Sequence, residues 1–479
     1  MADAPDAIVV GSGPNGLAAA VTLAQAGLRV HVYEGAKTPG GGARTEELTL
    51  PGFQHDVCSA VHPLALASPF FRRFGLASRG VRLLEPEVQF AHPLDGGRAG
   101  FVVRSLDDTA DALRSDARAY RRWCSGAVRH ADDVIDITLS TLRRPPRHPL
   151  KVARFGLSAV SSARRMAAHF ETDEGRGLLA GVAAHAMLPL HRPPTGAVAL
   201  LLGALGHAVG WPVVEGGSDR LIAAMVNAVE NAGGAVITDT FVRSLDELPR
   251  ARAVLLDVAP RALLQLGGDR LSAGYRRALT RFRYGPGVCK VDFALSGAVP
   301  WTAEPCRRAG TVHLGGTFDE IAASEDDVAA GRHPQRPYVL VAQPGVVDAS
   351  RAPAGRHTLW TYCHVPAGST VDMSGQIEAQ LERFAPGFRD LVLAKSVRTA
   401  AAEEAENPNY VGGDIAAGAQ TLWQTFARPA PRWNPYRTGI PGIYLCSAST
   451  PPGPGVHGRC GELAAQTALR DVFHLATTN

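Results

Sequence analysis

The chain opens with a glycine-rich turn set between a strand pattern and a helix pattern. The stretch VVGSGPNGLAAA places glycines at Gly11, Gly13 and Gly16. The apolar run Ala7–Val10 precedes the turn, and Leu17–Ala26 follows it with the composition of an apolar helix. A G-x-G-x-x-G pattern in this strand–turn–helix context predicts a dinucleotide-binding βαβ unit.

Each glycine of the turn has a distinct physical task. Gly11 permits the tight turn, and Gly16 permits close packing of the helix on the strand. Gly13 lets the backbone approach a pyrophosphate at the helix N-terminus, with Pro14 and Asn15 in the same loop. We therefore expect all five residues to contact the cofactor or to shape its site.

An acidic residue ends the second strand of this unit. Glu34 closes the stretch RVHVYE, 18 residues after Gly16, which suits a carboxylate that accepts hydrogen bonds from an adenosine ribose. No arginine stands beside it in the sequence to receive a 2′-phosphate. The pattern therefore disfavours NADP.

The same combination of strand and helix patterns occurs twice more, far along the chain. Ser218–Asp257 reads as helix, strand and strand, and Gly442–Leu469 as strand, Gly/Pro loop and apolar helix. With 479 residues the chain is too long for one ordinary core, so we expect two domains. The predicted dinucleotide domain is discontinuous, and two long insertions form a second domain. We expect the active site in a cleft between these two domains. The expected segments are, for the first domain, residues 1–65, 208–275 and 435–479, and for the second, residues 66–207 and 276–434.

Composition and charge exclude several classes of protein. A net charge of +4 gives no indication of nucleic-acid binding, and seven scattered cysteines without a C-x-x-C pair exclude a redox dithiol and argue against a metal site. The start of the chain lacks the pattern of a signal peptide. The uncharged stretch Pro193–Val214 contains four glycines and three prolines, so it predicts a buried helix followed by a strand instead of a membrane span. We expect a cytoplasmic protein.

A second glycine turn distinguishes FAD from NAD as the expected cofactor. The stretch EGAKTPGGGARTEELTLPGFQHD sets Gly41, Gly42 and Arg44 shortly after Glu34. It resembles the extended dinucleotide signature of the FAD enzymes that include phytoene desaturases and flavin amine oxidases. The resemblance implies that these three residues contact FAD.

Two later segments resemble the same family. GIYLCSASTPPGPGVHGRCGELAAQTAL is similar to its closing flavin-contacting motif, which implies that Ser449, Gly455, Val456 and Gly461 lie at the flavin. Free N–H groups at the start of the last helix would stabilise negative charge on the reduced flavin. GWPVVEGGSDRLIAAMVNAVENAGG resembles the family's middle motif, which implies that the backbone of Val242 contacts adenine.

The resemblance covers nearly the whole chain. Within the phytoene desaturase-like FAD-dependent oxidoreductases it points to the branch that includes pyridine nucleotide-disulfide oxidoreductase domain-containing protein 2. It implies an α/β fold with a Rossmann-type, glutathione reductase-like FAD domain and a mixed-sheet substrate domain. The implied reaction is hydride transfer from an apolar, isoprenoid- or lipid-like substrate to flavin N5. Amine oxidation, with an aromatic cage, and a non-catalytic FAD-binding or escort role remain open; the cage candidates are Tyr284, Trp360, Tyr362 and Tyr410.

Three residues are candidates for catalysis. Lys290 lies on the predicted strand VCKVDFAL ahead of Trp301, and flavin amine oxidases carry a lysine on a comparable strand that orients water at N5. His62 and His457 lie in segments expected to face the flavin and could act as bases. An ordinary strand lysine and hydrogen-bonded structural histidines are the alternatives.

A basic segment offers a surface for peripheral membrane contact. Residues 143–170 hold seven Arg and Lys residues and no acidic residue. An apolar helical stripe beside them would let the segment lie on the inner face of a membrane, and a solvated face is the alternative. The stripe consists of Val152, Phe155, Ala159, Ala163 and Met166.

Overall fold

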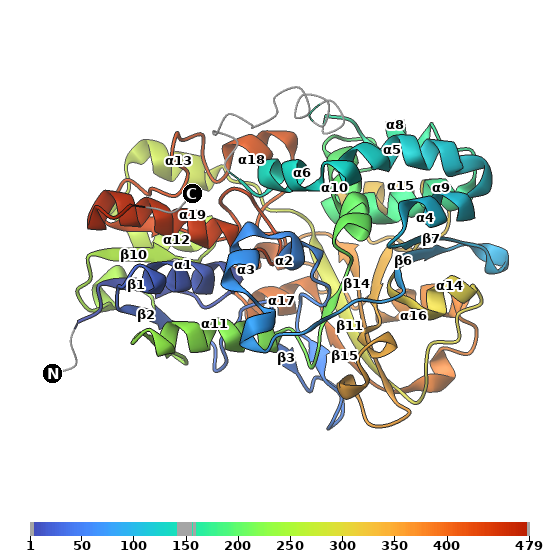
Figure 1. Ribbon diagram of the computed structural model, residues 1–479, viewed down its shortest axis with the longest axis horizontal. Helices are drawn as coiled ribbons and strands as arrows, with labels where there is room; N and C mark the ends of the chain where they lie inside the picture. Colours follow the sequence, from blue (N-terminus) through green and yellow to red (C-terminus); the bar gives the residue numbers. More distant parts are fainter. Residues whose placement is uncertain (1–3, 141–155, 157–159, 477–479) are drawn as a thin grey trace.

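The fold is built on two β-sheets that lie side by side. The structure, a computed structural model, describes residues 4–140, 156 and 160–476. A five-stranded sheet lies at the end where both termini are found, and a seven-stranded sheet lies at the other end (Figure 1).

The five-stranded sheet is parallel throughout and has the order β16-β10-β1-β2-β9. The central strand β1 and its neighbour β10 are buried along their whole length, as expected for a sheet covered on both faces. Three distant parts of the chain contribute to it, which confirms the predicted discontinuous Rossmann-type α/β fold. The strands are β1 (Ala7–Val10), β2 (Val30–Tyr33), β9 (Ala235–Ile237), β10 (Ala253–Leu256) and β16 (Ile443–Leu445).

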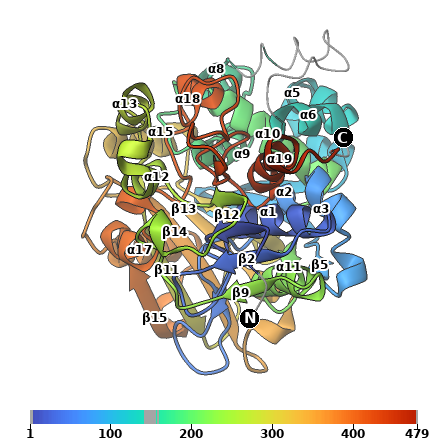
Figure 2. The ribbon, with the colours of Figure 1, turned by 90° about the vertical axis from the view of Figure 1, so that its left-hand side faces the viewer.

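Helices cover both faces of the parallel sheet. Alternate strand residues divide between two clusters, because Val9 and Leu255 pack with one set of helices and Ile8 and Leu256 with the other. Figure 2 views this end of the molecule, with α1, α11 and α19 on one side and α12 and α13 on the other. These helices are α1 (Pro14–Gln25), α11 (Asp219–Asn231), α12 (Pro260–Gly267), α13 (Ala273–Thr280) and α19 (Arg459–Ala468).

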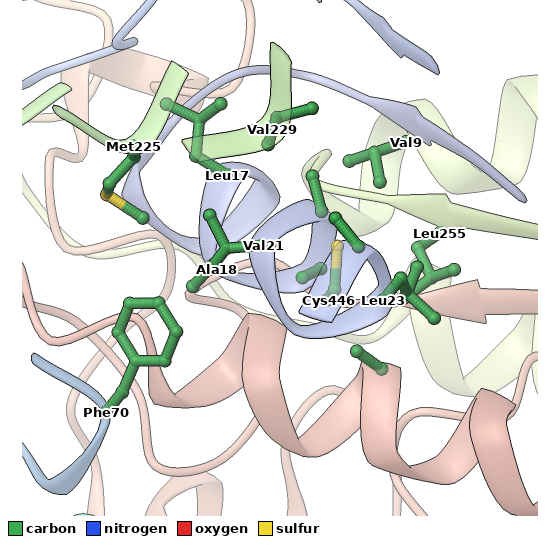
Figure 3. Close-up of a cluster of buried hydrophobic side chains, with 14 of the residues drawn as sticks. Val9, Leu17, Ala18, Val21, Leu23, Phe70, Met225, Val229, Leu255 and Cys446 are labelled. Atoms are coloured by element: carbon green, nitrogen blue, oxygen red, sulfur yellow. The ribbon is translucent and has the colours of Figure 1, made fainter. Parts of the chain in front are cut away.

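Helix α1 lies at the centre of the first cluster. Figure 3 shows Leu17 and Val21 of α1 among side chains from the sheet and from α11, including Met225, together with Cys446, which follows β16. Helix α19 packs so closely on α1 that a Cβ atom at Gly461 would lie 1.7 Å from the carbonyl oxygen of Asn15. The last helix therefore holds the first one against the sheet.

The seven-stranded sheet is mixed, as predicted. Its order is β15-β11-β14-β13-β12-β6-β7, and only the β12–β6 pair is parallel. One face packs on α16 (Ser374–Phe384), and the other packs on helices from the first insertion. The strands are β6 (Val88–Pro93), β7 (Ala99–Val103), β11 (Gly287–Leu295), β12 (Ala309–Leu314), β13 (Val339–Ala342), β14 (His357–Val365) and β15 (Val392–Arg398).

Shorter elements complete the structure. The two-stranded ladders are β3 (Thr45–Glu46) with β4 (His55–Asp56) and β5 (Leu83–Leu84) with β8 (Val213–Val214). The other α-helices are α2 (Pro63–Ala67), α3 (Pro69–Phe74), α4 (Leu106–Ala112), α5 (Ala117–Arg129), α6 (Ala131–Thr138), α8 (Ala163–Ala167), α9 (Asp173–Ala183), α10 (Thr195–Ala208), α14 (Glu304–Arg307), α15 (Phe318–Ala329), α17 (Ala400–Glu406) and α18 (Leu422–Ala427).

The uncharged stretch forms the buried helix α10 followed by β8, as predicted. Among the residues described, none of the helices combines the length and hydropathy needed to cross a bilayer. Most of the basic segment 143–170, with Val152, Phe155 and Ala159, lies outside the described residues. Peripheral membrane contact therefore stays a prediction, as do the domain boundaries.

The contact of α19 with α1 predicts a large effect of one substitution. Gly461→Val should destabilise the protein by more than the ~1–3 kcal/mol usual for overpacking, because the new side chain would collide with backbone that cannot move aside. Thermal denaturation measures the change. The control is Gly126→Ala on the exposed side of α5, where a Cβ atom meets open space and helix propensity predicts equal or higher stability. Equal stability of the two variants would contradict this account of the α1–α19 contact.

Candidate functional site

A cavity of about 1490 Å³ lies between the two sheets. One side is formed by the carboxyl ends of the parallel strands, where Gly11, Glu34 and Asp257 lie, and the other by the mixed sheet, with Trp360 and Tyr362. Ligands of open α/β sheets bind at this end of the strands. The volume exceeds the ~300–1,000 Å³ of a site for one small ligand, so a cofactor and a substrate both have room.

The two glycine turns meet at this cavity. Gly11 has φ +95° and Gly41 has φ +55°, values that glycine adopts without strain. A Cβ atom at Gly41 would lie 3.2 Å from the Cα atom of Gly13, and one at Gly13 would lie 2.9 Å from a carboxylate oxygen of Asp257. The φ of Gly13 is an ordinary −61°, so its need for glycine comes from space and not from backbone conformation. Gly11, Gly13 and Gly41 therefore form a narrow groove of backbone without side chains, which we call the cradle.

The start of α1 faces this cradle. Pro14 and Asn15 line the cavity, and the buried side-chain oxygen of Asn15 has no hydrogen-bond partner among the described residues. Gly16 lies behind the wall, where a Cβ atom would come within 2.0 Å of the Gly11 carbonyl oxygen. The turn therefore has the close packing and the open helix N-terminus that a pyrophosphate requires.

Glu34 is held in place at the end of β2. Its carboxylate accepts hydrogen bonds from the Ser12 amide at 2.8 Å, the Ser12 hydroxyl at 2.5 Å and the Ala36 amide at 2.8 Å. A carboxylate offers about four acceptor positions, so one remains for a ribose hydroxyl. The position and orientation suit the predicted role.

Arg44 and Gly42 lie on the second turn. The Nε of Arg44 donates to the Gly41 carbonyl oxygen at 3.0 Å, and its Nη2 contacts Glu406 at 2.6 Å. A Cβ atom at Gly42 would lie 2.0 Å from the Tyr410 hydroxyl oxygen. Both residues line the cavity, with a buried cation beside the cradle.

The adenosine end of the cavity contains an arginine that the sequence reasoning missed. Val242 lines the cavity, as the resemblance implies, and the Thr240 amide donates to the Glu34 carbonyl oxygen at 2.8 Å. Arg243, far from Glu34 in the sequence, also lines the cavity. It lies in the segment that follows β9, the strand that pairs with β2.

Asp257 is a second residue that the sequence reasoning missed. It follows β10 directly, beside the glycine turn, and its carboxylate accepts a hydrogen bond from the Gly16 amide at 2.8 Å. Burial raises its pKa to about 7, and the nearby Glu34 adds to the shift. An acidic residue directly after a strand of a parallel sheet was the available signal.

His62 presents a free acceptor at the cavity wall. Its Nε2 lies 2.8 Å from the Ser218 hydroxyl oxygen, which donates its own hydrogen to the Ser59 carbonyl at 2.6 Å. Nε2 must therefore be the protonated nitrogen, and the buried Nδ1 has no partner among the described residues. Burial lowers the pKa of His62 to about 4, so the ring is neutral at pH 7.

The closing loop contributes three of its four predicted cofactor residues to the cavity wall. Ser449, Gly455 and Val456 line the cavity. His457 also lines it, but its Nδ1 accepts from the Arg459 amide at 3.0 Å and its Nε2 donates to the Gly453 carbonyl at 3.1 Å. Both nitrogens are occupied, which favours the structural alternative. Gly461 lies in the α1–α19 contact and not at the cavity.

Lys290 does not reach the cavity wall. Its Nζ forms a buried ion pair with Asp292 on the same strand and lies 5.7 Å from the centre of the Trp360 ring. Burial lowers the pKa of Lys290 and raises that of Asp292, while their mutual attraction opposes both shifts. Lys290 pairs in register with Tyr362 and Asp292 with Trp360, so the charge pair lies on the same face of the sheet as these aromatic side chains, beside them.

Three of the four candidate cage residues gather at the cavity. Trp360 and Tyr362 pack edge to face with their ring centres 5.1 Å apart, and Tyr410 also lines the cavity, with its hydroxyl at Gly42. Tyr284 is elsewhere, packed on Phe282, with its hydroxyl accepting from the Arg261 amide at 3.0 Å. Among the residues described, no cluster of potential metal ligands occurs.

Comparisons with known proteins agree with this arrangement. Residues 9–74 match the family described as NAD(P)-binding Rossmann-like domain. The chain is 27% identical to the rat pyridine nucleotide-disulfide oxidoreductase domain-containing protein 2, over 98% of this chain and 94% of the relative. It is 24% identical to a phytoene desaturase (lycopene-forming) from Paracoccus sp. (strain N81106 / MBIC 01143), over 98% of both chains.

The fold is shared with solved structures. An engineered triple mutant of putrescine oxidase superposes with a TM-score of 0.62 at 17% identity, covering 98% of this chain and 99% of that one. Together these findings confirm the resemblance to phytoene desaturase-like oxidoreductases that the motifs indicate.

The raised pKa of Asp257 predicts how stability depends on pH. In the unfolded chain this carboxyl titrates near its ordinary value of 3.8, so unfolding releases a proton between about pH 4 and pH 7. The group's contribution to the free energy of unfolding therefore falls as pH rises through this window, by about 1.4 kcal/mol per unit of pKa difference. Asp257→Asn retains an acceptor for the Gly16 amide and removes the charge. The variant should gain stability relative to the natural protein between pH 4.5 and pH 8, as measured by urea unfolding; parallel pH profiles would contradict the raised pKa.

Proposed function

We propose that this protein is an FAD-dependent oxidoreductase that dehydrogenates a small apolar substrate. The observation that carries the proposal is the continuity of one cavity from the glycine cradle to an apolar chamber at the mixed sheet. A cofactor held at the cradle would extend toward that chamber. Similarity to a phytoene desaturase supports the apolar substrate class.

The residues present fit FAD. The cradle of Gly11, Gly13 and Gly41 suits a pyrophosphate, and Glu34 suits the adenosine ribose. The closing loop lines the same cavity with Ser449, Gly455 and Val456 and leads into α19. The unpartnered His62 Nδ1 requires a donor from a ligand or from water. When bound, FAD supplies the hydride acceptor at N5, so the redox chemistry belongs to the cofactor.

The chain itself would orient the substrate and exclude water. The chamber walls are formed largely by aliphatic side chains from α10, the mixed sheet and two loops, namely Val198, Leu201 and Leu202, Leu340, and Met187 and Ile415. The acidic residues in the lining, Glu34, Asp257 and Glu406, belong to the cofactor side of the cavity. An apolar chamber favours a substrate that loses little by leaving water.

Amine oxidation is the second candidate. Trp360, Tyr362 and Tyr410 provide aromatic side chains at the same cavity, and aromatic faces attract a substrate ammonium group. A panel of amines and apolar alkenes, each tested for anaerobic bleaching of the flavin, separates the two reactions. A flavin that no compound bleaches would support the non-catalytic alternative.

The proposal predicts that the purified protein carries non-covalent FAD. Acid precipitation should release the yellow colour into the supernatant, where chromatography identifies FAD. Colour retained in the pellet would contradict non-covalent binding, and release of NADP in place of FAD would contradict the cofactor assignment.

A matched pair of variants tests whether the cradle holds this FAD. In Gly13→Val the new side chain meets Asp257 and occupies the cradle, so FAD content should fall at least tenfold. Gly274→Val is the control, since this glycine is exposed on α13 with open space around it. A folded Gly13→Val protein with normal FAD content would show that the cradle does not bind the cofactor.

The Lys290–Asp292 pair predicts a rescue. Lys290→Met leaves a buried carboxylate unpaired and should cost about 3–5 kcal/mol of stability. Adding Asp292→Asn removes that charge and should restore most of the loss. We expect flavin reduction in the double variant to stay within about threefold of the natural rate. A stable double variant slowed by the 10²–10⁴-fold typical of a lost acid–base group would instead place Lys290 in the reaction.

A further inference from the structure

The apolar chamber contains polar atoms that nothing in the described structure satisfies. The Nε1 of Trp360 and the Oγ1 of Thr311 are buried and lack hydrogen-bond partners among the described residues. Both side chains line the cavity, with 6% and 1% of their surface exposed. Unsatisfied buried groups are costly, so two of them on one wall call for an explanation.

Strand register places these two groups on one face of the mixed sheet. Thr311 pairs with Ala342 on the next strand, and Ala342 pairs with Trp360 on the strand beyond. Side chains in such a row project to the same side of the sheet. The small Ala342 lies between them, so the two polar side chains lie on either side of a depression in the cavity wall formed by the mixed sheet.

A third polar group faces the same chamber. His185 lines the cavity, and its Nε2 lies 3.0 Å from the Nε2 of His313, which occupies the next position on the Thr311 face of β12. Burial lowers the pKa of His185 to about 3 and holds that of His313 well below its ordinary value, so both rings are neutral and one of them donates.

The direction of this hydrogen bond follows from His313. Its Nδ1 is buried without a partner among the described residues. A buried N–H without an acceptor is rarer than a buried acceptor without a donor. Nδ1 of His313 is therefore the unprotonated nitrogen, and its Nε2–H donates to Nε2 of His185. The proton of His185 is then on Nδ1. His185 is thereby a hydrogen-bond donor, as Trp360 always is and Thr311 can be.

We propose that the substrate carries a hydroxyl or carbonyl oxygen, and that Trp360 and Thr311 bind this oxygen, with His185 as a further donor at the chamber. The proposal rests on the proposed function only in treating this chamber as the substrate side of the cavity. A pure hydrocarbon would bury the indole N–H and the hydroxyl without compensation. An oxygen-bearing apolar molecule satisfies them and fills the remaining aliphatic walls.

The experiment compares three matched probes on the FAD-loaded protein: 1-octanol, 2-octanone and n-octane. Dissociation constants come from ligand-dependent thermal stabilisation. The variants are Thr311→Val and Trp360→Phe, which preserve shape and remove the polar atom. Leu340→Met is the control, because it alters an apolar part of the same wall. FAD content is measured for every variant.

Each of the two polar-to-apolar variants should weaken binding of octanol and octanone by about 2- to 12-fold, the usual effect of one lost hydrogen bond, and leave octane unchanged. Leu340→Met should affect all three probes alike. Equal losses for octane, no binding of octanol or octanone by the natural protein, or loss of FAD from either variant would overturn the proposal. The last result would assign these atoms to the cofactor. Absence of FAD from the natural protein would count against the proposed function alone, since the three probes can be titrated without it.

Discussion

The fold depends on backbone contacts that only glycine allows. At Gly16 and Gly461 the space that a side chain would occupy is already filled by main-chain atoms of the glycine turn and of α1. These two approaches bring β1, α1 and α19 together, and they leave the turn between them open to the cavity. The same bare backbone that packs the domain therefore shapes the cofactor cradle.

A second constraint is charge buried where the two sheets meet. Arg351, from the second insertion, contacts Asp56 and Asp348 at 2.9 Å each, and all three are almost fully buried. Although burial alone would raise it, Arg351 and the Ser218 amide lower the pKa of Asp56. Because such a pair is costly to break, it fixes how the insertion lies on the cofactor-binding part. The position of Ser218, and through it the orientation of His62, follows from this contact.

The sequence predicted the parts of the structure whose signals are local. The turn at Gly11–Gly16, Glu34 at the end of β2, the strand and helix near Gly461 and the buried helix α10 all follow from residue patterns within short windows. The discontinuous sheet was predictable because each of its three segments repeats a recognisable strand–helix pattern. Resemblance to a family supplied what pattern alone could not, the identity of the second glycine turn and the closing loop.

The sequence did not predict which distant segments border the cavity, nor which candidate side chains already have partners. Arg243 lines the cavity in the segment after β9, which pairs with β2, and Lys290 faces Asp292 because residues two apart on a strand share a face. His457 was a reasonable candidate base, and only the hydrogen bonds of both ring nitrogens show its structural use.

The order in which the parallel sheet is assembled differs from the order in which it is synthesised. The central strand β1 emerges first, its neighbour β10 about 250 residues later, and α19 only after about 460 residues have been made. Contacts of such long sequence separation form slowly and leave apolar faces exposed meanwhile. The nascent chain must therefore keep α1 protected during most of translation, and the finished cradle becomes available to a cofactor only at the end of synthesis.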